Sequence, residues 1–146
     1  MMVGSVRIVI PGEPVAKGRP RFGAGLRPYT PAKTRQAEGI ASSAARVAMA
    51  GRDVFAGPIR VHILAVFPVA KSWPKSRRED ALNGKIHVTK KPDIDNVAKL
   101  VTDAMNGIVW IDDSQIVELE AAKVYGENPR TIVSVNPVDV LRYGRE

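Results

Sequence analysis

The sequence predicts a single α/β domain of the α+β kind, spanning residues 1–146, with a mixed sheet packed by two helices in the order β-α-β-α-β-β. Three observations support this prediction. Several short segments alternate apolar and polar residues, and two longer ones repeat their apolar residues at helical spacing. The 146 residues are enough for one buried core. No internal repeat or linker divides the chain.

The first half of the chain predicts a strand, a helix and a second strand. Val6 to Ile10 alternates and stops at Pro11-Gly12, as a strand does. Residues 13–29 form a loop rich in Pro, Gly and Arg. An alanine-rich helix follows up to Ala50, with Thr30 as its N-cap, Pro31 at its first position and Gly51 as its stop. The next strand lies between two prolines and places on one face Ile59, Val61, Ile63, Ala65 and Phe67.

The second half predicts a helix followed by a hairpin. Residues 68–92 form a long basic connection with room for one helical turn at 77–82. The helix 96–106 ends at Asn106-Gly107, and its apolar face consists of Val97, Leu100, Val101, Ala104 and Met105. Residues 108–111 are expected to be extended. Residues 116–124 form a strand, with 131–135 as its hairpin partner across GENPR.

Composition narrows the classes of function. The chain has no cysteine, which excludes disulfides, thiol catalysis and zinc–thiolate sites. It has no apolar run near the roughly 18 residues that cross a bilayer, so we expect no membrane association, and its start lacks signal-peptide architecture. These features suit a cytoplasmic protein of a bacterium or of a phage-infected cell.

Charge is divided unevenly along the chain. Residues 1–91 contain 17 Lys or Arg against 5 Asp or Glu, whereas residues 92–146 contain 5 against 10. A basic part joined to an acidic part indicates a surface for a polyanion around a carboxylate-rich site. Nucleic acid is the obvious polyanion, because Lys and Arg contacts to phosphates supply most non-specific affinity. An unevenly charged solubilising surface explains the asymmetry equally well.

Four aspartates suggest a metal site. Asp93 and Asp95 precede the helix 96–106, which is roughly 16 Å long at about 1.5 Å per residue. Residues 108–113, if extended, cover about 20 Å at roughly 3.3 Å each. An outward helix and an extended return would bring Asp112 and Asp113 back to the start of the helix. The sequence therefore predicts three or four carboxylates in one small volume.

Such a carboxylate cluster needs a cation. Oxygen donors favour Mg²⁺, which binds one or two carboxylates together with water or substrate phosphate. Neighbouring residues of a strand point to opposite faces, so only one of Asp112 and Asp113 can be a direct ligand if they are extended. A calcium loop is excluded, because Val97 and Ala98 occupy positions that need a ligand and a glycine.

Each of these residues also has a structural alternative. Lys99 could hold a substrate phosphate, or it could form an ion pair with Asp95 one helical turn away. Asp95 could be a helix N-cap. Asp112-Asp113 could belong to an ordinary turn. The matched lengths of helix and return favour the site over these alternatives taken together.

Residues 91–123, KPDIDNVAKLVTDAMNGIVWIDDSQIVELEAAK, resemble the RusA family of Holliday junction resolvases, particularly its phage and prophage members. The matching elements are D-x-D-N, the lysine four residues after its second Asp, DAMNG, DDSQIVE, and a lysine ten residues beyond the second Asp of the DD pair. The joint pattern covers about a quarter of the chain. The order of elements and the segment KGRPRF…YTP are also similar to phage-type members. The connection 68–92 is longer than in the most compact members.

The resemblance implies a homodimeric, Mg²⁺-dependent endonuclease that nicks four-way DNA junctions symmetrically in recombination and repair, with Mn²⁺ able to substitute. It implies Asp93, Asp95 and Asp113 as metal ligands, Asp112 as the less certain member of its pair, and Lys99 as a catalytic lysine. A C₂ dimer suits the approximate twofold symmetry of a four-way junction. The bound metal would activate water, so no protein nucleophile is needed.

The basic part of the chain is expected to contact the DNA. The residues concerned are Lys17, Arg19, Arg21, Arg27, Lys33, Arg35, Lys75, Arg77, Arg78, Lys90 and Lys91. Phe22, Tyr29 and Trp73 could stack on bases or could simply pack within the protein. Two other readings remain open: a nuclease for other branched DNA, such as flaps and forks, and a non-catalytic DNA-binding module whose acidic cluster caps a helix.

Overall fold

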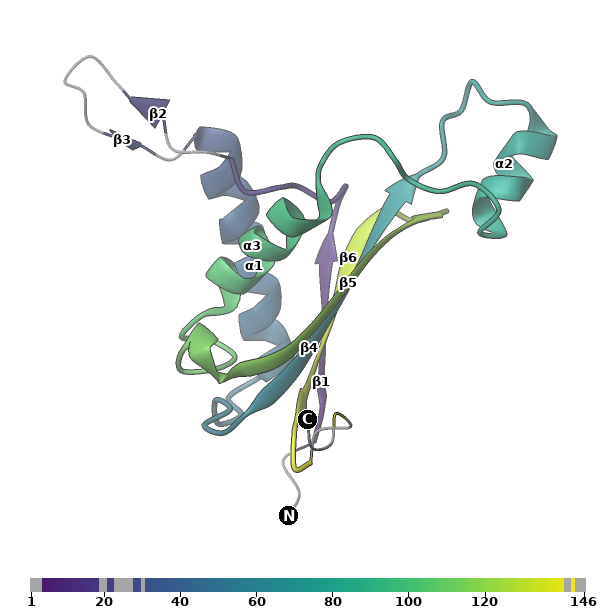
Figure 1. Cartoon of the computed structure of the whole chain (residues 1–146). Helices are drawn as coiled ribbons and strands as arrows, with labels where there is room; N and C mark the ends of the chain where they lie inside the picture. The colour runs from purple at the N-terminus through teal and green to yellow at the C-terminus, as the bar shows by residue number, and fades with distance from the viewer. Residues whose placement is uncertain (1–3, 19–20, 23–27, 30, 141–142, 144–146) are drawn as a thin grey trace.

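The computed structural model describes residues 4–18, 21–22, 28–29, 31–140 and 143. Within these residues a four-stranded sheet has the order β1-β6-β4-β5, and three α-helices accompany it (Figure 1). The strands are β1 (Val6–Pro11), β4 (Ile59–Pro68), β5 (Ile116–Gly126) and β6 (Arg130–Pro137). The helices are α1 (Ala32–Met49), α2 (Lys75–Leu82) and α3 (Ile94–Met105). The mixed α+β architecture and the order of its main elements are as predicted.

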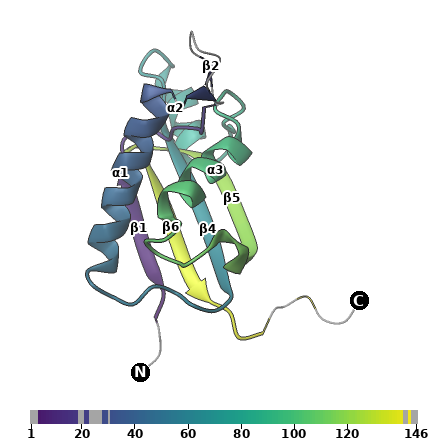
Figure 2. The same ribbon diagram turned by 90° about the vertical axis from the view of Figure 1, so that its left-hand side faces the viewer.

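The helices α1 and α3 cover one face of the sheet (Figure 2). The buried face of β4 is the predicted one, since Ile59, Val61, Ile63 and Ala65 are fully buried and Phe67 nearly so. The apolar face of α3 is also as predicted, from Val97 to Met105. Between the two layers lies the buried indole of Trp110.

The predicted β5–β6 hairpin is wrong. β6 pairs antiparallel with β1 on one side and β4 on the other, while β5 pairs parallel with β4. The long crossover through α2 and α3 makes the parallel pairing possible. Alternation alone does not reveal a strand's partner, and neighbouring strands in sequence pair only about two-thirds of the time.

The segment that connects β5 to β6 passes over the end of β4, because the two strands lie on opposite sides of it. Gly126, the last residue of β5, lies beside Pro68 and against Val66. A Cβ atom at position 126 would overlap the Cγ1 atom of Val66. This close approach explains the glycine at the point where the chain leaves β5.

The first helix differs from its prediction in detail. Its N-cap position is Pro31 and it begins at Ala32, one residue later than expected; the predicted cap, Thr30, lies outside the described residues. Ala50 adopts a left-handed conformation with φ of 46° and ends the helix just before Gly51. The buried face follows the small residues rather than the branched ones, since Val47 is 79% exposed.

The segment after α3 was expected to be extended but forms a tight turn. Gly107 N–H donates to the Trp110 carbonyl, and Val109 N–H donates to the Met105 carbonyl. A short 3₁₀ helix, η1 (Asp113–Gln115), then leads directly into β5. The Gln115 amide donates to the carbonyls of Phe55 and Gly57. These bonds keep residues 107–115 at the C-terminal end of α3.

Three short elements were not predicted in full. The strands β2 (Arg21–Phe22) and β3 (Pro28–Tyr29) pair antiparallel within the arginine-rich loop. The helix α2 has eight residues where a single turn was expected. It lies within the long connection 68–92, away from the α1–α3 layer (Figure 1). In the described part of the chain, we find no helix with the length and apolarity needed to cross a membrane.

Candidate metal and DNA site at the start of α3

The carboxylates of Asp93 and Asp95 stand at the start of α3. The helix begins two residues earlier than predicted, so Asp93 occupies the N-cap position and Asp95 lies in the first turn. Asp93 makes no side-chain capping hydrogen bond, and Asp95 is not the N-cap residue that the structural alternative required. Among the described residues, the cation that pairs with Asp93 is Lys91, whose Nζ lies 3.9 Å from Asp93 Oδ1. Both carboxylates are exposed and available to a ligand.

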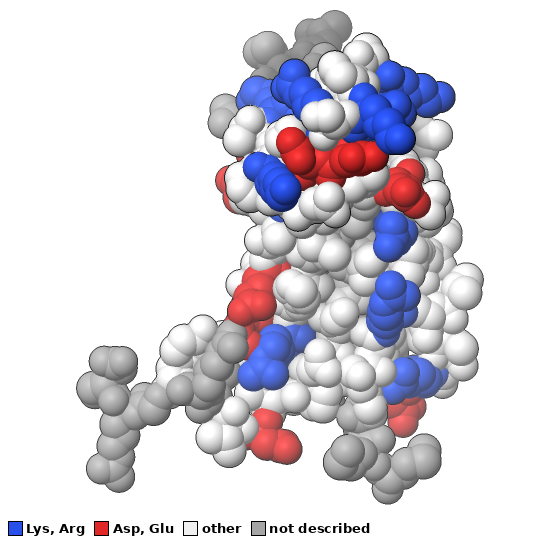
Figure 3. Space-filling model, turned by 90° about the vertical axis from the view of Figure 1, so that its right-hand side faces the viewer, with Lys and Arg blue, Asp and Glu red and all other residues white. Residues whose placement is uncertain are grey.

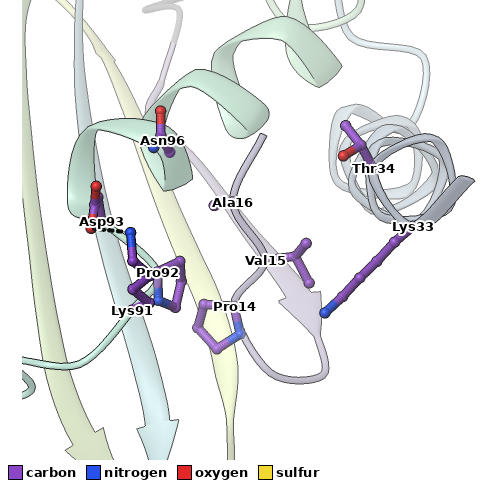
Figure 4. Close-up of a pocket in the computed structure, with 9 residues that line it drawn as sticks. All are labelled: Pro14, Val15, Ala16, Lys33, Thr34, Lys91, Pro92, Asp93 and Asn96. Carbon is purple, nitrogen blue, oxygen red and sulfur yellow. Dashed lines mark ion pairs between the residues drawn. The ribbon is translucent and has the colours of Figure 1, made fainter. Parts of the chain in front are cut away.

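An open pocket of about 390 Å³ adjoins this helix start. Figure 4 shows Asp93 and Asn96 of α3 on one side of it and Lys33 of α1 on the other. The segment before β2 forms part of its wall through Pro14, Val15 and Ala16. The pocket therefore combines oxygen donors with a positively charged rim.

Lys123 fixes the backbone that leads into Asp93. Its Nζ atom donates to the carbonyl of Lys90 at 2.8 Å and to that of Pro92 at 3.0 Å. The sequence predicted no role for this lysine, although it belongs to the motif that resembles RusA. Its position on β5, ten residues after Asp113, was the available signal. It joins the far half of β5 to the start of α3.

A small apolar cluster supports the same region. Val97 of α3 packs with Ala65 and Phe67 of β4 and with Val88 of the long connection. The partly buried ring of Tyr125 packs against this cluster. The backbone on both sides of Asp93 is thus anchored in the core, while the carboxylates remain in solvent.

The other predicted ligands are engaged in the structure of η1. Asp113 Oδ1 accepts a hydrogen bond of 2.8 Å from the indole of buried Trp110. Asp112 Oδ2 accepts from the Ser114 backbone N–H at 2.9 Å, and this bonding to Ser114 lowers the pKa of the Asp112 carboxyl. In turn, the Gln115 Oε1 atom accepts a hydrogen bond from the Asp112 backbone N–H, and the two bonds form a capping box. The alternative that Asp112-Asp113 belongs to a turn is therefore confirmed.

The expected convergence of the four aspartates within one chain is wrong. Asp93 and Asp95 lie at the N-terminal end of α3, and Asp112 and Asp113 follow its C-terminal end (Figure 1). No three Asp, Glu, His or Cys side chains in the described part of the chain are grouped closely enough to hold one metal ion. The prediction assumed an extended return, whereas the chain turns at Gly107 and remains at that end.

Two lysines near the site are held in ion pairs. Lys17 Nζ lies 2.8 Å from Asp103 and 2.9 Å from Glu38, and hydrogen bonds to these carboxylates raise the pKa of Lys17. Burial opposes ionisation of Asp103, but the bonds from Lys17 and Lys99 outweigh it and lower the pKa of Asp103. Lys99 pairs with Asp103 at 3.2 Å and not with Asp95. Its side chain remains 62% exposed.

The Lys17 ion pairs also fix the base of the arginine-rich loop. The Lys17 N–H donates to the carbonyl of Asn96 on α3. The next residue, Gly18, donates its N–H to Thr34 Oγ1 on α1 at 3.0 Å. Both contacts hold the loop base against the two helices. Lys17 is therefore placed in a structural network, where the sequence predicted a DNA contact.

The remaining predicted DNA-binding residues fall into four groups. Lys33 and Arg35 are exposed in the first turns of α1, and Lys90 and Lys91 are exposed just before Asp93. Lys75, Arg77 and Arg78 are exposed on α2, where basic side chains gather (Figure 3). Arg19 and Arg27 lie outside the described residues, and only the backbone of Arg21 is described, in β2.

Of the three aromatic residues considered for base stacking, Trp73 is a packing residue. Its ring lies edge-on to Tyr125 at 5.6 Å, and the guanidinium of Arg77 stands 4.0 Å above it. These contacts join the α2 segment to β5. The side chains of Phe22 and Tyr29 lie outside the described atoms.

The start of α3 has the donor chemistry that Mg²⁺ prefers. Asp93 and Asp95 supply carboxylate oxygens, and Mg²⁺ commonly binds to one or two carboxylates with water and substrate phosphates completing its shell. The exposed Lys90, Lys91 and Lys99 can hold phosphate oxygens. Residues 93 and 95 therefore fit part of a Mg²⁺ site in one chain.

Comparison with known proteins agrees with these observations. A family model described as Endodeoxyribonuclease RusA matches residues 11–136, which run from the last residue of β1 to the last but one of β6. The uncharacterized protein YqaN of Bacillus subtilis (strain 168) is 35% identical over 140 residues, covering 91% of this chain and 96% of YqaN.

Proposed function

The chain belongs to the RusA family of endodeoxyribonucleases, and on this premise we propose that it is a Mg²⁺-dependent endonuclease for four-way DNA junctions. It acts as a homodimer in DNA recombination and repair, making paired symmetric nicks that leave a 3′-hydroxyl and a 5′-phosphate. Mn²⁺ substitutes for Mg²⁺. This activity explains the exposed carboxylate pair beside a basic surface.

The main support for the proposal is the way in which Asp93 and Asp95 are exposed at the start of α3. Exposed carboxylates at a helix start usually cap the helix or pair with cations. Asp93 has no capping bond, and the nearby Lys99 pairs with Asp103 instead of Asp95. A bound cation would give both carboxylates a closer partner than the described part of the protein supplies, since Lys91 Nζ lies 3.9 Å from Asp93 Oδ1.

The residues of the chain have distinct roles in this reaction. Asp93 and Asp95 would hold the Mg²⁺ ion, which would provide a Lewis acid for the scissile phosphate and lower the pKa of a coordinated water. Lys90 and Lys91 hold the DNA backbone beside the carboxylates. Lys99 stabilises negative charge on the reacting phosphate. Lys123 holds the 90–92 backbone that positions Asp93.

Asp112 and Asp113 require a second protomer to take part. Because they lie beyond the opposite end of α3 in their own chain, we infer that they complete the metal site of a neighbouring protomer. Asp93 and Asp95 of one protomer would then meet Asp113, and less directly Asp112, of the partner subunit. The carboxylates of one chain would serve two sites.

A nicking assay on synthetic DNA tests the proposed activity. The protein should cut a four-way junction in Mg²⁺ and be silent in EDTA, with much weaker action on linear duplex. Flaps and forks at equal concentration separate a junction resolvase from a broader branched-DNA nuclease. Metal-independent binding without any product on all these substrates would leave only the DNA-binding alternative.

Mixing two inactive variants tests the shared site. Asp95→Asn and Asp113→Asn protomers, unfolded and refolded together, form heterodimers. One of the two sites in such a heterodimer has every carboxylate, so single nicks should return. If each site came from one chain, both sites of the heterodimer would carry a defect and no nicking would return.

A further inference from the structure

A second pocket lies between α2 and the C-terminal end of β5, with a volume of about 280 Å³. Its walls include the apolar side chains of Leu82, Ile86 and Val124, and its polar groups include Asn83 and His87. Leu82, at the end of α2, is 40% exposed. Pockets for drug-sized ligands have roughly 300–1,000 Å³, so this pocket suits a smaller group.

The polar groups of this pocket are free to bind a ligand. The side chains of Asn83 and His87 are exposed and form no hydrogen bond or ion pair with the described residues. Lys123 also lines the pocket, but its ammonium is bonded to the carbonyls of Lys90 and Pro92. None of the described residues that line the pocket carries a carboxylate. The lining therefore suits a flat, neutral group with polar edges better than a metal ion or a bare anion.

A nucleobase is a group of this kind. Its faces pack against apolar or aromatic side chains, and its edge carries hydrogen-bond donors and acceptors. The amide of Asn83 can donate and accept at the same time, and the imidazole of His87 can also bond to a base edge. The pocket thus offers apolar contact to a base and two side chains to its edge.

The pocket adjoins the candidate metal site through Lys123. This lysine lines the pocket and holds the carbonyls of Lys90 and Pro92, which lie just before Asp93 in the chain. A base in the pocket would therefore belong to a nucleotide close to the phosphate that Asp93 and Asp95 face.

The frame around the pocket is anchored to the sheet. The ring of Trp73, just before α2, lies edge-on to Tyr125 at 5.6 Å, and Arg77 of α2 stands over the same ring. Ala81 of α2 is buried, and Val88 packs in the cluster that supports the start of α3. The pocket is thus held in place by contacts on both sides, as a preformed ligand site is.

Basic side chains lie on the segments that form the pocket. Lys75, Arg77 and Arg78 are exposed on α2, where Figure 3 shows basic side chains gathered, and Lys85 and Lys90 are exposed after it. Lysine and arginine contacts to phosphates hold a nucleic-acid backbone without regard to sequence. Proteins that bind unpaired nucleic acid combine such contacts with platforms on which bases pack.

We propose that the pocket between α2 and β5 binds one unstacked nucleobase of the DNA, next to the phosphate that is cut. This inference rests on the proposed function for the position of that phosphate. Extruding a base costs least where its pairing or stacking is already interrupted. The pocket therefore favours a nucleotide at a branch point over one within a continuous duplex, and α2 contributes to the choice of substrate.

Junctions that carry a single 2-aminopurine, a fluorescent analogue of adenine, test the pocket without cutting. Stacking quenches this base, so its fluorescence should rise several-fold when the protein binds the junction in EDTA, at one position beside the cut. The double variant Asn83→Ala, His87→Ala should lose this rise. Circular dichroism checks that the variant is folded, and fluorescence anisotropy of an end-labelled junction checks that it still binds.

An abasic nucleotide at the same position gives a second, independent measurement. The wild-type protein should bind the abasic junction about 10-fold more weakly than the intact one, as the loss of a base contact does. The double variant has already lost that contact and should bind both junctions equally. A purely structural role of Asn83 and His87 would not produce this coupling.

The second histidine of the chain supplies the matched control. His62 is exposed on β4 and does not line the pocket. His62→Ala should therefore keep both the fluorescence rise and the preference for the intact junction. Loss of both in His62→Ala, to the same extent as in the double variant, would overturn the proposal.

The outcomes separate the pocket from the proposed function. Nicking in Mg²⁺ without a fluorescence rise at any position, or a double variant that still discriminates against the abasic junction, overturns the base pocket and leaves the nuclease activity. A rise that depends on Asn83 and His87 in a protein that never cuts would reject the proposed function and retain the pocket. Tight binding of a free deoxynucleoside monophosphate without DNA would assign the pocket to a nucleotide ligand and overturn its role toward DNA.

Discussion

The two ends of α3 carry the same chemical group in opposite states. At the N-terminal end, Asp93 and Asp95 are exposed and make no capping bond. At the C-terminal end, Asp113 accepts from the buried Trp110 indole and Asp112 caps η1. The difference teaches that a carboxylate's partners, more than its place in a motif, indicate whether its removal affects catalysis alone or folding as well.

The largest effect on activity is expected at the N-terminal end of α3, where Asp93 and Asp95 are exposed. Asp95→Asn should lower junction nicking by about 100-fold or more, as the loss of a group that stabilises reacting charge does. The free energy of unfolding should change by about 1 kcal/mol at most, because Asp95 forms no ion pair or side-chain hydrogen bond with the described residues and loses mainly its interaction with the helix dipole. Nicking rates in Mg²⁺ and urea unfolding measure the two effects. A loss of stability as large as that of an Asp113 variant would remove the contrast between the ends.

At the C-terminal end of α3, two substitutions of Asp113 should separate an effect on stability from an effect on activity. Asp113→Ala leaves the buried Trp110 N–H without its acceptor and should destabilise the fold by about 1–3 kcal/mol. Asp113→Asn keeps an oxygen acceptor, so its stability should remain close to that of the wild type. Urea unfolding of the two variants gives the comparison.

The nicking assay completes this test of Asp113. Asn lacks the negative charge that a metal ligand needs, so Asp113→Asn should be nearly inactive despite its stability. Full activity in Asp113→Asn would restrict Asp113 to its structural role at η1. The proposed shared metal site would then lose its best partner residue.

Lys123 tests whether the backbone before Asp93 must be held in place. Lys123→Met removes the ammonium that bridges the Lys90 and Pro92 carbonyls. The Mg²⁺ concentration for half-maximal nicking should rise about 10-fold, in the range found for groups that support metal ligands. Lys123→Arg keeps a cationic donor and should recover part of the affinity. Equal Mg²⁺ dependence in all three proteins would argue against a positioning role.

The smallest effect concerns Asp103, between the two ends of α3. The folded-state pKa of Asp103 lies below its ordinary value of 3.8, so its ion pairs stabilise the fold above that pH and weaken as the pH falls through the lower value. Asp103→Asn should lose about 0.5–1 kcal/mol at pH 7, and this difference should shrink as the pH falls well below 3.8. Urea unfolding at both pH values measures it. A difference that persists unchanged in acid would point to lost packing.

Lys17 gives the alkaline counterpart of this dependence. Its folded-state pKa is raised above 10.5, so its contribution is complete below that value and is lost as the pH rises through the folded-state pKa. At neutral pH both members of the pair are charged. The Lys17 ion pairs at the base of the arginine-rich loop should therefore not change with pH through the physiological range.

Periodicity predicted the main elements well because burial sets it. The alternation of β4 and the apolar face of α3 follow directly from which side chains enter the core. Strand partners were harder to predict. β6 lies between β1 and β4, where Val133 and Val135 are fully buried. The alternation of apolar residues along β6 does not indicate which strands lie beside it.

The candidate site was only half predictable. The motif located Asp93 and Asp95 correctly at a helix start, but the path after Gly107 depends on a buried tryptophan and on the Gln115 bonds to distant carbonyls. Those contacts are non-local, so counting residues along an assumed extended segment could not reveal them. The role of Lys123 was missed for the same reason, since its partners lie more than 30 residues away.

The clamp at the base of the arginine-rich loop has an evolutionary consequence. Before the loop, the backbone N–H of Lys17 is hydrogen-bonded to α3 and that of Gly18 to Thr34 of α1. Thr34 itself belongs to the helix that follows the loop. Since the two ends are fixed close together, residues between them can be added or deleted at a small entropic cost and with no change in the core. If the proposed function is correct, relatives could change which DNA they bind by resizing this segment alone, without any change at the start of α3.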